Sequence, residues 1–314
     1  MPGNPVIVQP AYNLWSEPWI TAEGLDGQEH GVGIREALAK AHVFGSVVDH
    51  SPLVAVGILR LLIAVLHSAL EPKRLLDLSA LNREGAFPAS ALDTFGNSFA
   101  DRFDLFSAER PFLQSADLSL APGKSDRVKT AAYLFAEMAS GTAVAHFRHG
   151  HQDDQRLCPA CAARGLVVVP AFATSGGQGM KPSINGVPPI YVMPGGRSLF
   201  DMLIRSLALE GAQPAAASNR SDAVWWRRST SSVERGKAVR EVGYLQSLTF
   251  PARRIRLHPI PNATTCTRCG STSDWTVPTM VFDMGETRPN GGAAWLDPFA
   301  AYRILEKKKQ TAVS

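Results

Sequence analysis

The sequence predicts an α+β fold, irregular and rich in loops, with a buried N-terminal helix and a knuckle built from four cysteines. Three observations support this prediction. Residues 53–66 (LVAVGILRLLIAVL) are almost wholly apolar, which is typical of a helix enclosed by other helices. Residues 253–259 (RRIRLHP) alternate polar and apolar side chains, which predicts a strand. The 26 glycines and 22 prolines among 314 residues require many turns.

Length and charge limit the kind of protein. A chain of 314 residues has room for a sizeable core and, at about 100–200 residues per domain, for two domains. We expect a helical or mixed part over 1–118 and a loop-rich part over 119–305, joined in one continuous globular unit, with a disordered tail over 306–314. The 32 basic and 28 acidic residues give a net charge of +4. That surplus excludes an acidic tail protein and is too small to establish nucleic-acid binding.

We expect neither a signal peptide nor a membrane span in the N-terminal half of the chain. The first residues lack the basic and apolar regions of a signal peptide. The apolar run 53–66 is shorter than the roughly 20 residues that a membrane span needs, and it contains Arg60. We therefore expect a buried core helix in a cytoplasmic protein that does not contact a membrane.

The other elements follow from local patterns in chain order. We expect short strands and turns over 11–30, a helix over 33–44, the buried helix over 53–70, mixed structure over 72–118 and, within it, a helix over 101–114 that ends at a Pro-Phe turn. Further on we expect mostly loop over 119–198, a helix over 199–209, an exposed linker over 212–222 and the strand over 253–259. Trp225 and Trp226 are expected to pack inside the protein.

All four cysteines occur in two pairs of identical spacing, Cys158-Pro-Ala-Cys161 and Cys266-Thr-Arg-Cys269. Each C-x-x-C turn aims two sulfurs at one point, and two such turns complete the tetrahedron that Zn²⁺ prefers. Gly270 suits the tight turn after Cys269, because glycine tolerates positive φ. Since no ligand position is left open, the pattern predicts one structural zinc ion per chain. The zinc-stapled four-cysteine knuckle would clip the segment near 160 to the segment near 268.

Other interpretations of the cysteines stay open. A redox C-x-x-C motif normally occurs once, after a strand and at the start of a helix, so two copies disfavour it. The others are a disulfide and a set of unrelated thiols. The 104 residues between the pairs exceed the usual spacing of a zinc ribbon, so the knuckle is not a self-contained finger.

Positive charge is concentrated in residues 220–256. This stretch holds nine lysines and arginines against three acidic residues, and its net +6 exceeds the +4 of the whole chain. A local surplus favours phosphate binding, although a merely solvated basic face would have the same composition. The nine residues are Arg220 and the basic patch, which we define as Arg227, Arg228, Arg235, Lys237, Arg240, Arg253, Arg254 and Arg256.

Short motifs spread from 13 to 303 occur in the order of one known family. They are Asn13-Leu14, Glu17-Pro18-Trp19-Ile20, Ile34-Arg35-Glu36-Ala37-Leu38, the apolar run 53–66, Phe103-Asp104-Leu105-Phe106, Arg110-Pro111-Phe112-Leu113-Gln114, Ser140-Gly141, both C-x-x-C pairs, Gly176-Gly177-Gln178-Gly179, Pro188-Pro189, Ser198-Leu199-Phe200 and Trp295-Leu296-Asp297-Pro298. On these residues the chain resembles the CasA family, the large subunits of the type I-E CRISPR surveillance complexes known as Cascade.

The resemblance implies a protein that binds target double-stranded DNA at the protospacer-adjacent motif and aids opening of the duplex. In such complexes the guide RNA reads the sequence by base pairing. The implied partners are the other Cascade subunits, the guide CRISPR RNA and the target DNA. The chain also lacks the G-x-S-x-G, H-E-x-x-H and P-loop motifs, so we expect no enzyme activity.

The resemblance further implies a loop that holds the complex together near the 5′ end of the guide. It corresponds to residues 140–151, where Phe147, Arg148 and His149 combine a stacking side chain with cations. A solvent-exposed loop with an incidental aromatic residue is the alternative. The spacing of the three histidines in this loop disfavours a metal site.

The family's glycine loop, which approaches the motif from the minor groove, corresponds to Gly176, Gly177, Gln178 and Gly179. Glycine permits close approach of the backbone to DNA, Gln178 can reach minor-groove acceptors, and Lys181 can hold a phosphate. An ordinary flexible turn is the alternative. Where the family has a lysine after the second C-x-x-C pair, the nearest cation here is Arg288.

The sequence ends soon after Trp295-Leu296-Asp297-Pro298, where family members usually continue into a duplex-splitting glutamine wedge and a four-helix bundle. We expect a compact variant of the complex in which another component takes the role of the bundle. A function of another class stays open, a zinc-stapled structural adaptor that joins an assembly without reading DNA. The loops 140–151 and 174–181 discriminate between the two, because only a DNA reader needs them in one positively charged groove.

Overall fold

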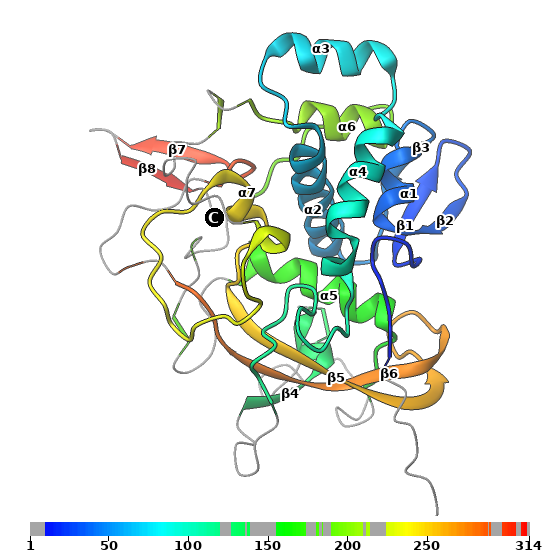
Figure 1. Ribbon diagram of the computed structural model, residues 1–314, viewed down its shortest axis with the longest axis vertical. Helices are drawn as coiled ribbons and strands as arrows, with labels where there is room; N and C mark the ends of the chain where they lie inside the picture. The colour runs from blue at the N-terminus through cyan, green and yellow to red at the C-terminus, as the bar shows by residue number, and fades with distance from the viewer. Residues whose placement is uncertain are drawn as a thin grey trace, which may run out of the picture.

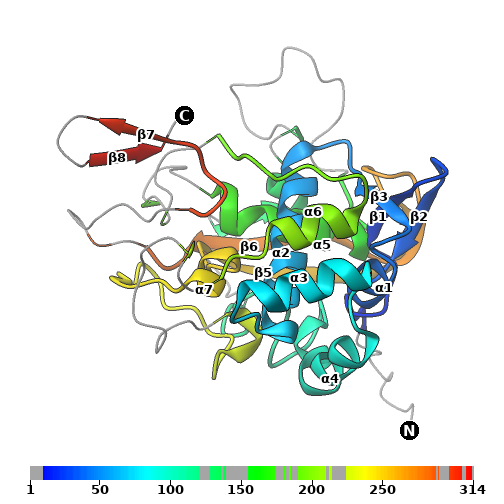
Figure 2. The ribbon, with the colours of Figure 1, turned by 90° about the horizontal axis from the view of Figure 1, so that it is seen from above.

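The computed structural model, shown in Figures 1 and 2, has a group of helices above a long two-stranded ribbon. The ribbon consists of β5 (Arg253–Thr265) and β6 (Thr272–Met284). The structure describes residues 10–119, 127–135, 137–138, 155–173, 180–181, 184, 190–209, 212–213, 224–287, 289, 297–305 and 309–312.

A small antiparallel sheet lies near the start of the chain, and two of its strands confirm the prediction for residues 11–30. Its strands are β1 (Ile20–Gly24), β2 (Glu29–Val32) and β3 (Phe44–Val47), in the order β2–β1–β3. Side chains along β1 alternate between buried and half-buried, so one face of the sheet covers the core. The helix α1 (Ile34–Ala39) occupies part of the range predicted as helical.

The helix α2 (Pro52–Leu70) lies at the centre of the molecule and confirms the predicted buried helix. It is long and apolar enough to cross a membrane, but 67% of its most apolar window is buried inside the protein. The helices α4 (Ala89–Phe99), α5 (Pro159–Phe172) and α7 (Tyr244–Leu248) pack on it. Gly57 permits the close contact with α5, because a Cβ there would lie 2.6 Å from the Val167 carbonyl oxygen. The packing is that of a core helix.

Two regions hold more helix than the sequence predicts. The mixed region 72–118 contains α3 (Leu75–Glu84), α4 and the 3-10 turn η1 (Ala100–Phe103), and the helix expected over 101–114 does not continue beyond η1. The region 119–198, expected to be mostly loop, contains α5 with Pro170 inside it. Ten of its 14 residues are buried, and this packing outweighs the helix-breaking tendency of proline. The predicted helix over 199–209 is shorter, α6 (Leu199–Arg205).

The second sheet carries three of the eight members of the basic patch, Arg253, Arg254 and Arg256, and the turn between its long strands carries the second cysteine pair. The strand β4 (Val128–Thr130) pairs with β6, and β6 with β5, all antiparallel. The strand predicted over 253–259 is confirmed and continues to Thr265. We call the turn 266–271 between the two long strands the cysteine end of the ribbon. At its opposite, cationic end, Arg253 pairs with Met284 and Arg254 with Asp283.

A hairpin of β7 (Tyr302–Leu305) and β8 (Lys309–Ala312) lies on the side of the molecule opposite the N-terminal sheet (Figures 1 and 2). Residues 309–312, which fall within the tail expected to be disordered over 306–314, form β8. The expectation rested on the position of these residues near the end of the sequence. Pairing of β8 with β7 uses backbone hydrogen bonds, which that position does not reveal.

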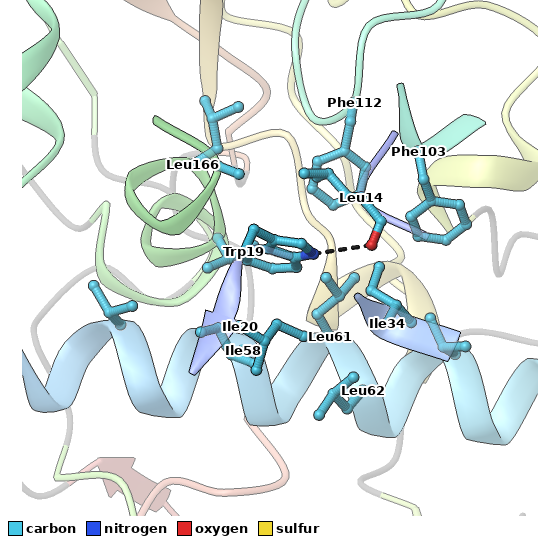
Figure 3. Close-up of a cluster of buried hydrophobic side chains, with 14 of the residues drawn as sticks. Leu14, Trp19, Ile20, Ile34, Ile58, Leu61, Leu62, Phe103, Phe112 and Leu166 are labelled. Atoms are coloured by element: carbon cyan, nitrogen blue, oxygen red, sulfur yellow. Dashed lines mark hydrogen bonds between the residues drawn. The ribbon is translucent and has the colours of Figure 1, made fainter. Parts of the chain in front are cut away.

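One hydrophobic core contains residues from Leu14 to Phe299 and so draws on both expected parts of the chain. Figure 3 shows Trp19 inside it, with its indole N–H donating to the Leu14 carbonyl at 2.9 Å. Trp225 and Trp226 are both buried, which confirms the prediction that they pack.

The core also encloses an ion pair. The Arg60 guanidinium donates to both carboxylate oxygens of Asp297 at 2.8 Å, and the two side chains are 1% and 2% exposed. The rings of Tyr191 and Phe299 lie 5.3 and 5.6 Å from the guanidinium carbon. This contact ties α2 to the segment that precedes β7.

Candidate metal centre and nucleic-acid contacts

The four cysteines meet between the start of α5 and the cysteine end of the ribbon. Cys158 immediately precedes α5, Cys161 lies in its first turn, and Cys266 and Cys269 belong to the turn between β5 and β6. Their sulfurs all lie within 4.8 Å of one another, and the Sγ atoms of Cys158 and Cys269 are 3.7 Å apart. No cysteine is in a disulfide, and only Cys269 is exposed. The clustering predicted from the two C-x-x-C pairs is confirmed.

This geometry fits a tetrahedral metal ion. Zinc–sulfur bonds of about 2.3 Å place the sulfurs of a four-cysteine site about 3.8 Å apart. Gly270 has φ of 75°, the left-handed conformation that the turn requires, and its N–H donates to the Cys266 carbonyl at 2.9 Å. The donor set of four sulfurs and the shape of the turn therefore suit zinc.

The thiols also perturb one another. Hydrogen bonding to Cys158 and Cys266, together with burial, holds the pKa of Cys161 well above its ordinary value. A hydrogen bond with Cys161 favours the thiolate of Cys158, but Cys266 and burial outweigh it and raise the pKa of Cys158 to about 12. Hydrogen bonds from Cys158 and Cys161 lower the pKa of Cys266. The cluster by itself thus favours a thiolate at Cys266, and a divalent cation would hold all four deprotonated.

Arg268, inside the second C-x-x-C pair, ties the cluster to the N-terminal sheet. Its guanidinium donates to both carboxylate oxygens of Asp49 and lies 4.3 Å from the ring centroid of Phe135. The Asp49 side chain is 1% exposed and also contacts Arg164 of α5 at 3.5 Å. One buried carboxylate therefore joins the cysteine turn, α5 and the segment after β3.

The structure divides the basic patch into two groups by exposure. The buried or half-buried members are Arg228, Arg253, Arg254 and Arg256. The exposed members are Arg227, Arg235, Lys237 and Arg240. Only the second group presents its charge directly to solvent.

Acidic residues from other parts of the chain neutralise much of the patch. The pairs with such residues are Arg227 with Glu71 at 3.2 Å, Arg228 with Glu286 at 2.8 Å, Arg235 with Asp283 at 3.0 Å and Arg254 with Asp117 at 2.5 Å. The partners in each pair are at least 48 residues apart in the sequence. The net +6 counted along 220–256 is therefore larger than the charge that this surface presents.

Asp283, at the cationic end, is shared among three arginines. Its side chain is 5% exposed and lies 3.3 Å from Arg127, 3.0 Å from Arg235 and 3.6 Å from Arg254. One carboxylate thus has more cationic partners than its charge requires. Any single one of these arginines can leave while the carboxylate stays paired.

Lys181 lies beside the same end of the ribbon. Its backbone N–H donates to the Met284 sulfur at 3.4 Å, its carbonyl accepts from Arg253 at 3.4 Å, and its side chain is exposed. The other predicted contacts with DNA, guide or complex fall outside the described residues. These are Gly176, Gly177, Gln178, Gly179, Arg288, Phe147, Arg148 and His149.

Sequence reasoning missed the carboxylates that hold these sites. Asp49, Asp283 and Glu286 stand in no motif, and each is buried next to arginines that arrive from elsewhere in the chain. Arg60 did carry a signal, because a charged residue inside an apolar run is rarely buried without a partner. That signal points to a missing carboxylate without identifying Asp297.

Comparison with known proteins agrees with the fold. The family model of CRISPR-associated protein Cse1 matches residues 13–314. The CRISPR-associated protein CasA/Cse1 of Thermus thermophilus is 33% identical over 264 residues, which cover 74% of this chain and 51% of that protein. The chain thus spans about half the length of this curated relative.

Two solved structures extend the comparison. Cse1 from Acidimicrobium ferrooxidans has a TM-score of 0.76 at 25% identity, over 98% of this chain and 58% of its own. A chain in the structure of a CRISPR RNA-guided surveillance complex has a TM-score of 0.74 at 22% identity, over 96% of this chain and 62% of its own. At 22% identity, this second similarity shows a shared fold only.

Proposed function

The chain belongs to the CRISPR-associated Cse1 (CasA) family, and from that premise we propose that it is the large, non-catalytic subunit of an RNA-guided surveillance complex of the Cascade type. It binds target double-stranded DNA at the protospacer-adjacent motif and aids opening of the duplex, while the guide RNA reads the sequence. The observation that carries this proposal is the family match over residues 13–314. Its partners are then the other Cascade subunits, the guide CRISPR RNA and the target DNA, in the cytoplasm.

Within this function the four-cysteine cluster has a structural role. Cys158, Cys161, Cys266 and Cys269 would hold one Zn²⁺, because four thiolates in a tetrahedral arrangement suit this ion. The protein fills all four ligand positions, which leaves none for water or substrate. When bound, the ion supplies binding energy that holds the cysteine end of the ribbon against α5.

We assign contact with the motif to Gly176, Gly177, Gln178, Gly179, Lys181 and Arg288. Glycine amides approach a groove closely, and Lys181 adds a cation beside the cationic end of the ribbon. The residues Phe147, Arg148 and His149 serve contacts with the guide and the rest of the complex by stacking and charge. The basic patch adds phosphate contacts that do not depend on sequence.

The test is DNA binding by the assembled complex after Gly177→Asp. A carboxylate and a Cβ in a loop that approaches DNA should weaken binding to a duplex with the matching motif by roughly tenfold or more. Gly195→Asp is the matched control, because Gly195 is exposed and a Cβ there meets nothing within 4 Å. Dissociation constants are measured at a stated salt concentration for duplexes with and without the motif.

A companion variant, Phe147→Ala, should weaken the same binding through the assembly of the complex. Its control is Leu76→Ala, which removes an exposed apolar side chain of α3. Wild-type affinity in both Gly177→Asp and Phe147→Ala would defeat the site assignment. A complex that assembles normally but shows no preference for the motif would defeat the DNA-reading function itself.

One observation favours the structural adaptor as the second candidate. Carboxylates from outside the basic stretch pair with Arg227, Arg228, Arg235 and Arg254, so less charge is free for nucleic acid than the sequence indicates. An adaptor would need the metal centre but not the glycine loop. It is the supported function if loss of the four-cysteine site disrupts the complex while Gly177→Asp changes nothing.

A further inference from the structure

A cavity of about 880 Å³ lies between the segment 227–239 and the start of β5. Five cationic side chains line it: Arg227, Arg228, Arg235, Lys237 and Arg254. Three acidic side chains also line it: Asp117, Glu234 and Glu286. The lining thus has a surplus of two positive charges. We call this cavity the cationic pocket.

Two of its cations belong to the scaffold. Arg228 is 15% exposed and pairs with Glu286, whose side chain is 4% exposed. Arg254 is 12% exposed and bridges Asp117 at 2.5 Å and Asp283 at 3.6 Å. Removing Arg228 would leave the buried Glu286 carboxylate without this cation, and removing Arg254 would take one cation from two carboxylates at once. These two arginines therefore shape the pocket and do not exchange with a ligand.

Arg227 and Lys237 are held much more weakly. Arg227 and Glu71 are 43% and 60% exposed at 3.2 Å, and Lys237 and Glu234 are 53% and 72% exposed at 3.6 Å. Exposed pairs of this kind contribute little to stability. A ligand anion can therefore replace either carboxylate with little loss.

Arg235 is free to exchange for a different reason. It is 48% exposed and lies 3.0 Å from the buried carboxylate of Asp283. That carboxylate keeps Arg127 at 3.3 Å and Arg254 at 3.6 Å when Arg235 turns toward a ligand. The rotation leaves no buried charge unpaired.

Hydroxyl groups line the same cavity. Ser229, Thr230 and Ser232 are exposed there, next in sequence to Arg227 and Arg228. The segment is held in place, because the Arg110 guanidinium donates to the Ser229 carbonyl at 3.3 Å. Cations and hydroxyl donors on a fixed backbone are the groups that bind phosphate oxygens in nucleic acids.

Lys181 lies near the segment that lines the pocket. A Cβ at Gly236, between the lining residues Arg235 and Lys237, would lie 2.8 Å from the Met284 methyl carbon. The Lys181 N–H donates to the sulfur of the same methionine. Met284 thus lies close both to the pocket segment and to the proposed motif-contact residue.

We propose that the cationic pocket seats backbone phosphates of the target DNA duplex next to the motif, independently of its sequence. Arg227, Arg235 and Lys237 supply the charge, and Ser229, Thr230 and Ser232 supply neutral donors. This inference rests on the proposed DNA-binding function and narrows the phosphate contacts proposed for the basic patch to one cavity, three exposed cations and three hydroxyl side chains. Duplex DNA is the occupant because Lys181, the proposed motif contact, and the pocket segment at Gly236 both lie against Met284.

The test is the triple variant Arg227→Gln, Arg235→Gln and Lys237→Gln in the complex assembled with its guide RNA. The control removes three charges elsewhere, by Lys73→Gln, Arg83→Gln and Arg197→Gln at exposed positions near or on α3 and α6. Dissociation constants are measured over a series of salt concentrations for duplexes with and without the motif. Thermal unfolding of both variants confirms that they are folded.

The expected loss is about fivefold for each phosphate contact at ~0.15 M salt, hence roughly 100-fold for three. The slope of log K against log salt should fall in magnitude by about 2 to 3 units. Both duplexes should lose affinity equally. The charge-preserving variant Arg227→Lys with Arg235→Lys should keep the wild-type salt slope.

The outcomes distinguish a failure of this inference from a failure of the proposed DNA-binding function. A wild-type complex without motif-dependent binding overturns the proposed function. A wild-type complex that binds normally while the triple variant matches the control overturns the pocket alone. Loss of motif discrimination, rather than of affinity for all DNA, also overturns it, because the pocket would then read sequence. Loss of guide RNA from the triple variant with unchanged DNA binding by the remaining complex assigns the pocket to RNA and overturns the proposal.

Discussion

The two ends of the β5–β6 ribbon hold their surroundings in different ways. At the cysteine end, four thiols converge, and the adjacent Asp49 and Arg268 side chains are 1% and 7% exposed. At the cationic end, Asp283 is shared among three arginines, and pairs such as Arg227 with Glu71 are about half exposed. The first arrangement is mostly buried, with Cys269 alone exposed among the cysteines, whereas the second is more open to solvent and has more cations than its shared carboxylate needs.

This difference indicates that the two ends of the ribbon have different roles. An enclosed cluster of charges and ligands stabilises a single arrangement, because each member loses its partner if another leaves. A surplus of exposed cations around shared carboxylates can exchange partners, which a surface that binds and releases DNA requires. The ribbon joins the two, so the cysteine end fixes the position from which the cationic end acts.

The largest effect is expected from Cys161→Ser, which removes one metal ligand at the cysteine end. Three thiols hold zinc much less tightly than four, so the free energy of unfolding should fall by on the order of 4 kcal/mol or more. Metal analysis should change from about one zinc per chain to nearly none. Denaturant unfolding measures the loss of stability.

Ser271→Ala is the control for this variant. Ser271 lies in the same turn and is exposed, and it contributes to the turn through its backbone carbonyl, which accepts from the Cys266 N–H at 2.9 Å. Its stability and zinc content should stay at the wild-type values. Wild-type protein without zinc and with four freely titratable thiols would refute the metal centre.

A smaller effect is expected from Asp49→Asn, and it compares the two ends directly. The amide cannot neutralise Arg164 and Arg268, which are 16% and 7% exposed, so the cost should be about 3–5 kcal/mol. The same change at the cationic end, Asp117→Asn, should cost less than about 1 kcal/mol, because Asp117 is 41% exposed and Arg254 keeps Asp283. Equal costs for the two variants, measured by denaturant unfolding, would remove the distinction between the ends.

The smallest effect is expected from His258, which lies on β5 between the two ends. Burial, with a further contribution from Arg256, lowers the pKa of His258 below its ordinary value. The unfolded chain therefore binds more protons between the folded pKa and about 6.5, so stability is full above about pH 6.5 and declines as the pH falls from there to the folded pKa. Unfolding free energies of wild type and His258→Gln between about pH 5 and 7.5 test this. A steeper decline in the variant would show that the sign is wrong.

The parts of the fold that the sequence predicts are those encoded over short stretches. The apolar run 53–66 and the alternation at 253–259 each lie within one element, and both predictions are confirmed. The helix α5 lies in the region 119–198, where turn clusters predict mostly loop, and its stability comes from packing on α2, where Gly57 meets Val167. A local sequence pattern carries no information on contacts between distant segments.

The same limit applies to the candidate site. The grouping of the cysteines was correct because the C-x-x-C spacing alone brings the two sulfurs of each pair together. A tetrahedral metal site needs two further ligands, and the other pair supplies the remaining cysteines. The basic patch looked more strongly charged than it is, because Glu71, Asp117 and Glu286 come from other parts of the chain. The cationic pocket depends on those residues as much as on the cations.

The ion pair of Arg60 and Asp297 joins residues 237 apart in the chain, so the order of synthesis matters to it. At roughly 5–20 residues per second, the ribosome completes Arg60 about 12–50 s before it adds Asp297. During that interval the guanidinium lacks this carboxylate, and burying it alone would be costly. The apolar helix α2 then waits, incompletely packed, for the segment that carries Asp297, and during this interval a nascent chain needs protection from aggregation.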